Sequence, residues 1–160
     1  MLVTEVELTT PSATTIVLTR SFAARRRTVF DAWTKPELLV RWFGADGWVL
    51  DTCEVDLRVG GRWRFVSRGP NGELMGHGGE YLEVDAPTRL RQTESFDDQW
   101  FPGEAQDTLE FVEVDGGTTV VLTMEFPSQE VRDAVVASPM RRGVEQGFRR
   151  LDAVLVEVAA

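Results

Sequence analysis

The chain has 160 residues and a mass of 17.9 kDa, which fits a single domain with a buried core. Hydrophobic residues make up 42% and charged residues 27% of the chain, values that exclude an intrinsically disordered or collagen-like protein. The formal net charge of -9 and the isoelectric point near 4.7 argue against a nucleic-acid partner, because such affinity rests largely on lysine and arginine.

The sequence also argues against a membrane protein or a metalloprotein. No apolar run approaches the roughly 20 residues that a membrane span requires, and the acidic, threonine-rich start of the chain lacks the pattern of a signal peptide. One cysteine, Cys53, and one histidine, His77, cannot assemble a Cys/His zinc site, and a single cysteine fits a reducing compartment. We therefore expect a cytoplasmic protein without a metal or another cofactor.

Local patterns predict the N-terminal part of the fold. Residues 1–14 are expected to form a loose tail, and residues 15–160 a single domain that begins with a strand over 15–22. The stretch RRRTVFDAW then predicts a short helix with one apolar side. Thr34 and Glu37 have the spacing of a capping box, which predicts a second short helix directly after the first.

From Trp48 onward the pattern becomes that of a β-sheet. The hydrophobic period shifts toward two, and glycine and proline turn signals recur about every ten residues. This spacing predicts a meander of antiparallel strands near 48–57, 61–68, 74–85, 89–97, 105–114 and 118–126.

The C-terminal part of the chain has helical periodicity. Ser128 is expected to cap a short helix that ends at Ala137, and Ser138 to cap the final helix. One apolar stripe follows that final helix through Met140, Val144, Phe148, Leu151, Leu155 and Val158. Because such a stripe must be covered, the helix should lie in the concave face of the sheet. The sequence predicts an α+β helix-grip fold, in which a curved antiparallel sheet of six to seven strands surrounds the long C-terminal helix.

The strand LRQTESFDD gives the strongest indication of function. Its alternate residues on one face are all polar, so the other face must point inward. The inward residues are Leu90, Gln92, Glu94 and Phe96. A buried, unpaired carboxylate costs several kcal/mol, so Glu94 requires a partner or water. A partly hydrated cavity beneath the final helix would supply either, with Gln92 and Glu94 in its wall.

Neighbouring elements should supply an apolar wall for the same cavity. By alternation, the strand residues expected to face it are Cys53, Val55, Trp63, Phe65, Leu109, Phe111, Leu122 and Met124. Met140, Val144 and Phe148 should face it from the helix. Gly143 and Gly147 have two interpretations, because a glycine on a helix either permits close packing or leaves space.

Six segments occur in an order and spacing that resemble a known family. They are VFDAWTKPELLVRWFG, CEVDLRVGGRWRFV, GEYLEVDAPTRLRQTE, WFPGEAQDTLEF, DGGTTVVLTMEF and MRRGVEQGFRRLDAVL. Together they resemble the START/Bet v 1-like (SRPBCC) superfamily, and within it bacterial single-domain proteins similar to the C-terminal domain of the activator of Hsp90 ATPase. The resemblance covers roughly Thr15–Ala159. It implies a largely hydrophobic cavity between sheet and long helix, with an entrance formed partly by the loop after the second short helix.

That loop region is rich in aromatic residues. Trp42, Phe43 and Trp48 lie in the stretch PELLVRWFGADGWVL, which is broken by Gly44 and Gly47. The resemblance implies that the three aromatic side chains line the mouth of the cavity. Alternatively they fill a small core, since large aromatics dominate both cores and binding pockets.

Four residues are candidates for chemistry. Glu94 is the first choice for a general acid or base, with His77 or Tyr81 assisting, because a carboxyl in apolar surroundings acquires a pKa suited to proton transfer. His77 lies in the glycine-rich segment MGHGGEY, where a bulge at Gly78-Gly79 would reverse its facing, and a structural role is the alternative. Cys53 is expected to be an inert thiol, since burial opposes formation of the thiolate.

Three functions are compatible with these features. The first is binding of a small, mostly hydrophobic molecule that Gln92 and Glu94 orient. The second is an enzyme of the aromatase/cyclase or hydrolase kind that uses the same cavity, as the resemblance implies. The third is an Hsp90-type co-chaperone, also by resemblance. In each case we expect no nucleic-acid or membrane partner, and the sequence leaves a homodimer open.

Overall fold

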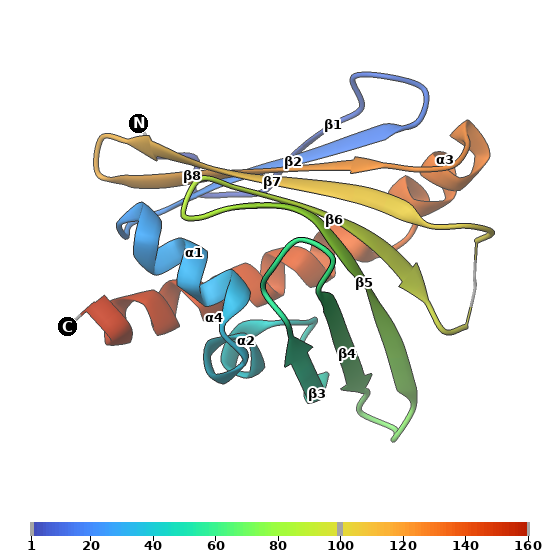
Figure 1. Cartoon of the computed structure of the whole chain (residues 1–160), viewed down its shortest axis with the longest axis horizontal. Coiled ribbons are helices and arrows are strands. Elements are labelled where there is room, and N and C mark those ends of the chain that lie inside the picture. Colours follow the sequence, from blue (N-terminus) through green and yellow to red (C-terminus); the bar gives the residue numbers. More distant parts are fainter. Residues whose placement is uncertain (1, 99–100, 160) are drawn as a thin grey trace.

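The computed structural model, which describes residues 2–98 and 101–159, is a curved antiparallel sheet with a long helix in its concave face (Figure 1). Over these residues the elements are β1 (Glu7–Thr9), β2 (Thr15–Phe22), α1 (Arg26–Thr34), α2 (Pro36–Trp42), β3 (Val49–Val55), β4 (Arg62–Arg68), β5 (Leu74–Asp85), β6 (Arg89–Phe96), β7 (Ala105–Val114), β8 (Gly117–Glu125), α3 (Gln129–Ala137) and α4 (Met140–Ala159). The α+β helix-grip prediction is confirmed, and the six meander strands begin and end within two residues of their predicted bounds.

The strand order explains how the sheet can surround a helix. The described strands follow the order β1-β2-β8-β7-β6-β5-β4-β3, and every neighbouring pair is antiparallel. The pairing of β2 with β8 joins the start of the chain to the end of the meander. In Figure 1 the sheet bends from β1 and β2 round to β3, while α1 and α2 lie on the open side beside α4.

The N-terminal segment corrects two expectations. It adds β1 to the edge of the sheet, so the described sheet has eight strands rather than six to seven. The register pairs Glu7 with Thr19, and the Ser21 amide donates to the Val3 carbonyl at 2.7 Å. Val6 is only 2% exposed. Residues 2–14 therefore include an ordered strand and do not form a loose tail.

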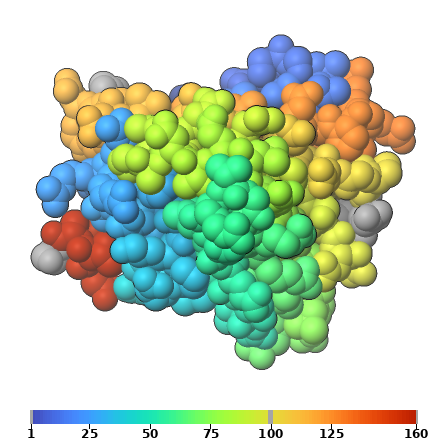
Figure 2. Space-filling model, viewed as in Figure 1, coloured from blue at the N-terminus to red at the C-terminus, as the bar shows by residue number. Residues whose placement is uncertain are grey.

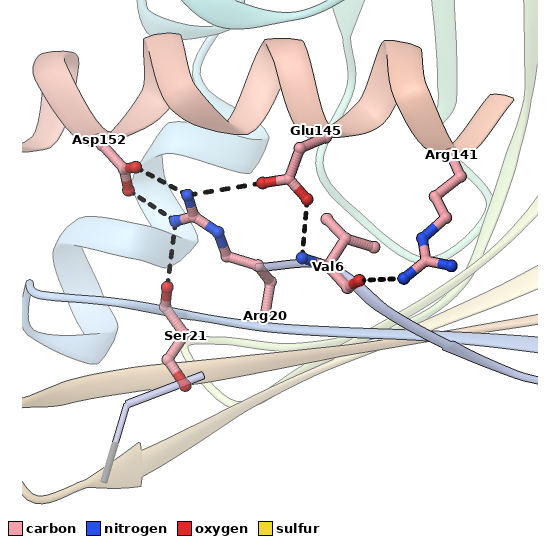
Figure 3. Close-up of polar contacts among 6 residues, drawn as sticks. All are labelled: Val6, Arg20, Ser21, Arg141, Glu145 and Asp152. Carbon is pink, nitrogen blue, oxygen red and sulfur yellow. Dashed lines mark hydrogen bonds and ion pairs between the residues drawn. The ribbon is translucent and has the colours of Figure 1, made fainter. Parts of the chain in front are cut away.

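A polar cluster fastens α4 to β2 and to this N-terminal segment (Figure 3). Arg20, which is 4% exposed, donates to the two carboxylate oxygens of Asp152 at 2.6 and 2.7 Å. Glu145 lies 4.0 Å from Arg20 and accepts a hydrogen bond from the Val6 amide at 2.7 Å. Arg141 donates to the Val6 carbonyl at 2.8 Å. Because these groups come from distant parts of the sequence, they fix the position of the helix over the sheet.

An aromatic core fills the space between α1, α2 and the middle of α4. The Phe22 and Phe148 rings meet edge to face with centroids 5.3 Å apart, and Trp33 lies 5.6 Å from Phe148 and 4.8 Å from Trp42. Leu151 is fully buried beside them. Such ring pairs add stability beyond their buried area. The core therefore packs against α4 at Phe148 and Leu151, in the middle of the helix.

Of two helix caps predicted from the sequence, one is confirmed and one is wrong. Ser128 accepts a hydrogen bond from the Val131 amide at 3.2 Å, which confirms the predicted start of α3. The capping box at Thr34 and Glu37 is wrong. Thr34 is the last residue of α1 and its hydroxyl donates to the Phe30 carbonyl at 3.0 Å, so Lys35 takes the cap position of α2.

Candidate functional site

A cavity of about 310 Å³ lies between the concave face of the sheet and the N-terminal half of α4. In the space-filling view, the strands β3 to β5 and their connecting loops form the centre and the lower right of the visible face (Figure 2). The residues expected from the sequence that line it are Trp42, Phe43, Trp63, Phe65, His77, Tyr81, Gln92, Glu94, Phe96, Leu109, Leu122, Met124, Met140, Val144 and Phe148. The structure thus brings side chains from seven different elements, α2, β4 to β8 and α4, to one space.

Four residues expected at the cavity do not line it. Phe111 is 1% exposed and packs under α1, with its ring 5.2 Å from that of Phe30. Trp48 follows a turn in which its amide donates to the Ala45 carbonyl at 3.1 Å, and it does not reach the cavity wall. Helix α1 therefore covers this end of the sheet, and the cavity is shorter than strand alternation alone predicted.

Cys53 and Val55 are the other two, and both lie on the edge strand β3. Their register pairs Cys53 with Phe65 and Val55 with Trp63, and the partners on β4 line the cavity in their place. Burial raises the pKa of Cys53 to about 11, and the negative charge of Glu37 on the nearby helix α2 adds to this effect. Cys53 is therefore a poor nucleophile.

One acidic residue and several small or apolar residues line the cavity without having been predicted from the sequence. Asp107 on β7 is 5% exposed and lines the cavity. It lies two positions before the inward Leu109, so strand alternation was a sufficient signal. The other additions to the wall are Leu18, Trp33, Leu39, Gly44, Ala45, Met75, Gly143 and Gly147.

Glu94 and Asp107 form the polar end of the cavity. They lie on neighbouring strands, whose register pairs Gln92 with Asp107, and the two carboxyls share a hydrogen bond. Burial raises the pKa of Glu94 to about 6, against the lowering effect of that hydrogen bond. Burial and the Glu94 charge raise the pKa of Asp107 well above its usual range. Asp107 therefore holds its proton more tightly than an ordinary aspartate does, and the Glu94–Asp107 pair resists carrying two negative charges.

His77 is held within a cage of aromatic rings. Its ring stacks on two neighbours at interplanar angles of 19° and 26° and meets two others edge to face. These rings are Phe43, Trp63, Phe65 and Phe96. The strand pairing is regular from Leu74 to Glu80, and the irregularity in β5 comes only after Tyr81, so His77 and Tyr81 both face inward.

This setting keeps His77 uncharged. Burial lowers the pKa of His77 to about 4, assisted by the positive charge of Arg64 and opposed by Asp97. Its Nε2 lies 3.8 Å from Oε2 of Glu94, and among the described residues its Nδ1 has no hydrogen-bond partner. Near neutral pH the imidazole is therefore a neutral polar group at the edge of the carboxyl pair.

Tyr81 and Gln92 complete the polar region. Tyr81 is 4% exposed and lies opposite Gln92 in the pairing of β5 with β6. Burial raises the pKa of Tyr81 well above its usual range, so the side chain stays a neutral phenol. Both side chains can exchange hydrogen bonds with a ligand without carrying charge.

The two helical glycines serve close packing against the loop after α2. A Cβ on Gly147 would lie 3.1 Å from the Gly44 carbonyl oxygen, and a Cβ on Gly143 would lie 3.2 Å from Cβ of Ala45. Both distances are shorter than side chains ordinarily allow. The glycines also line the cavity, so close approach of the loop and shape of the cavity are linked at these positions.

Polar contacts hold the same loop on α4. Gln146 accepts from the Asp46 amide at 2.9 Å, and Arg150 donates to the Asp46 carboxylate at 2.6 Å and also to the Gly44 carbonyl. Trp42, 3% exposed, donates from its indole to the Ala32 carbonyl at 2.9 Å. Trp42 therefore belongs both to the core and to the cavity wall, whereas the half-buried Phe43 covers the His77 ring.

Residues 23–156 match the family model described as activator of Hsp90 ATPase homolog 1-like protein. The chain belongs to this family. The resemblance noted in the sequence, including the wider Bet v 1-like superfamily, is thereby confirmed. No curated protein matches the chain.

Several solved structures have a similar fold. A Rhodobacter sphaeroides protein is 34% identical with a TM-score of 0.92, and the match covers 96% of this chain and 99% of that one. A Mycobacterium smegmatis protein is 25% identical with a TM-score of 0.84 and 96% coverage of both chains. The AHSA1 protein of Silicibacter pomeroyi, at 22% identity, a TM-score of 0.72 and coverage of 89% and 97%, agrees in fold.

Among the helices of residues 2–98 and 101–159, none has the length and apolar character to cross a membrane.

Proposed function

We propose that this protein binds a small, mostly apolar molecule in the cavity beneath α4. The observation that carries the proposal is a cavity of about 310 Å³ whose wall is apolar except for one polar end. Ligand sites in proteins typically have volumes from about 300 to about 1,000 Å³, with many apolar residues and a few polar groups that fix orientation. The cavity lies at the lower end of that range, which favours a molecule with one or two rings.

The fold supports the same proposal. Protein interiors are normally packed without large voids, yet here a cavity remains beside the part of α4 from Met140 to Phe148, while Leu151 and Leu155 further along the helix are buried in the core. A ligand would cover the apolar side chains that face this space. Gln92 and Tyr81 would orient it through neutral hydrogen bonds.

The test is binding of N-phenyl-1-naphthylamine, an uncharged fluorophore that brightens in apolar surroundings. The wild-type protein should bind it with saturation. Leu122→Trp, which fills the cavity from β8, should remove the signal, whereas Val121→Trp on the opposite face of the same strand should retain it. Val144→Phe supplies a second cavity-filling variant if Leu122→Trp does not fold, as judged by circular dichroism. Lack of saturable binding by the wild type, or equal binding by the filled variants, would refute the proposal.

A second candidate function is proton-transfer catalysis in the same cavity. The raised pKa of Glu94, about 6, favours it, because a carboxylate in an apolar site with such a pKa is an effective general base. A suitable probe is 5-nitrobenzisoxazole. The carboxylate would remove the proton on carbon 3, the N–O bond would break with its electron pair left on oxygen, and the ring would open to a nitrile and a coloured phenolate.

The expected rate rises with pH around an apparent pKa near 6, the value of Glu94. Glu94→Gln should abolish this catalysis, and the control Glu54→Gln, an exposed position on β3, should retain it. Equal rates in wild type and Glu94→Gln would reject the enzymatic candidate and leave the binding proposal in place.

A further inference from the structure

The charges in the cavity wall are all of one sign. Of the residues that line it, Glu94 and Asp107 are acidic, His77 and Tyr81 are the other titratable groups, and no lysine or arginine is among them. Near neutral pH the imidazole and the phenol are uncharged, for the reasons given above. Among the residues that the structure describes, the carboxyl pair therefore has no positive partner inside the cavity.

The elements packed around the pair add no compensating charge. From α4 the wall receives Met140, Val144 and Phe148 with the two glycines, and from β8 it receives Leu122 and Met124. The positive charge that acts on His77 is that of Arg64, which lies on β4 and donates to Asp97 through two hydrogen bonds of 2.6 Å. That ion pair does not line the cavity.

An unused acceptor points to a ligand. Asp107 is 5% exposed, it lines the cavity, and among the described residues its Oδ1 has no hydrogen-bond partner. Nδ1 of His77, a residue that is 3% exposed, is likewise unpartnered. Buried polar atoms in native proteins almost always have partners. A ligand with several N–H donors would satisfy Asp107 Oδ1 and the Glu94 carboxylate together.

We propose that the ligand is an apolar molecule carrying one protonated amine, whose ammonium group is bound by Glu94 and Asp107 at the polar end of the cavity. This inference rests on the proposed function and specifies the class of ligand. A primary ammonium supplies three donors and one positive charge, which complement the two acidic side chains and the unpartnered Oδ1 of Asp107. The same wall disfavours apolar acids, because a second anion would be brought beside the carboxylate without any cation.

The affinity for an amine should depend on pH. Protonation of Glu94 removes the negative charge of its carboxylate, so this affinity should fall as pH decreases through about 6. The titratable groups that face Glu94 are Asp107 from β7 and His77 and Tyr81 from β5. The pKa of His77 is lowered to about 4, that of Tyr81 is raised well above its usual range, and burial and the Glu94 charge raise that of Asp107. Affinity for a neutral analogue should show no such fall with pH.

The experiment compares three ligands of one shape: 4-phenylbutylamine, 4-phenylbutan-1-ol and 4-phenylbutyrate. Each displaces N-phenyl-1-naphthylamine from the wild-type protein at pH 7.5, and the dissociation constants are confirmed by calorimetry. We expect the amine to bind at least about tenfold more tightly than the alcohol, because hydrogen bonds to a charged group are stronger than neutral ones. The carboxylate should bind most weakly.

Glu94→Gln should reduce the ratio of amine to alcohol affinity to about one, Asp107→Asn should lower it in part, and Glu54→Gln should leave it unchanged. An amine preference below tenfold, or one that persists in Glu94→Gln, would overturn the proposal while binding of the fluorophore and the alcohol kept the proposed function intact. Absence of binding by the fluorophore and all three ligands would instead refute the proposed function.

Discussion

Replacing Glu94 with glutamine should stabilise the protein at alkaline pH and leave its stability unchanged in acid. Burial raises the pKa of Glu94 from 4.5 to about 6 in the folded protein, whereas the unfolded chain keeps the ordinary value. The folded state therefore binds this proton more tightly. The free energy of unfolding contributed by Glu94 is fully present below about pH 4.5 and is lost as pH rises to about 6.

The size of the effect follows from the two pKa values. Each pKa unit is equivalent to about 1.4 kcal/mol, so the rise from 4.5 to about 6 corresponds to about 2 kcal/mol. The side chain is 21% exposed, so solvent screens it little. Glutamine has nearly the same shape and no charge. At pH 8 the variant should be about 2 kcal/mol more stable than wild type, which for a chain of this length is a rise in Tm of about 4 to 8 °C.

Urea unfolding at pH 4 and at pH 8 measures the difference directly. Taking the difference between the two proteins at each pH removes the opposite contribution of His77, whose pKa is lowered to about 4. The exposed control Glu54→Gln should change stability by less than about 0.5 kcal/mol at either pH. A Glu94→Gln variant that is no more stable than wild type at pH 8, or equally stabilised at pH 4, would show that Glu94 is not a buried carboxyl.

Three further predictions concern other parts of the structure. In an NMR titration His77 should change protonation near pH 4, and a midpoint of 6 or above would contradict its burial among aromatic rings. Cys53, with a pKa raised from 9.0 to about 11, should react with iodoacetamide at pH 8 about 100-fold more slowly than a free cysteine peptide, because only the thiolate reacts. Asp152→Asn should lower the free energy of unfolding by about 2 kcal/mol in urea, because the buried Arg20 loses its charged partner. Asp56→Asn, at an exposed ion pair, should change it by less than about 0.5 kcal/mol and serves as its control.

The sequence by itself determined the helices, the strand β2, the six meander strands and most of their inward faces. Strand alternation and glycine turns are local signals, and they gave the meander bounds within two residues. The same alternation predicted that Gln92 and Glu94 lie at the cavity, where the structure has them. Adjacent strand residues point to opposite faces, so the polar row on the outer face of β6 places Gln92 and Glu94 on the inner face.

Tertiary structure decided which inward faces enclose space and which partners meet. Cys53 and Val55 follow the alternation, yet the cavity ends before the edge strand that carries them. Asp107 has an inward position that the sequence could indicate, but its hydrogen bond with Glu94 depends on the register of β6 and β7. The short strand β1 has no strong local pattern, and its place depends on contacts such as that of Val6 with Glu145 on α4.

The physical reason is the range of the forces involved. Dihedral preferences and the period of hydrophobic residues act over a few neighbouring positions, so they can be recognised in a single sequence. Registers, edge pairings and the gap under α4 arise from contacts between residues up to 139 positions apart, as for Val6 and Glu145. Many combinations of such contacts are compatible with the same local signals, and only the packed structure selects among them.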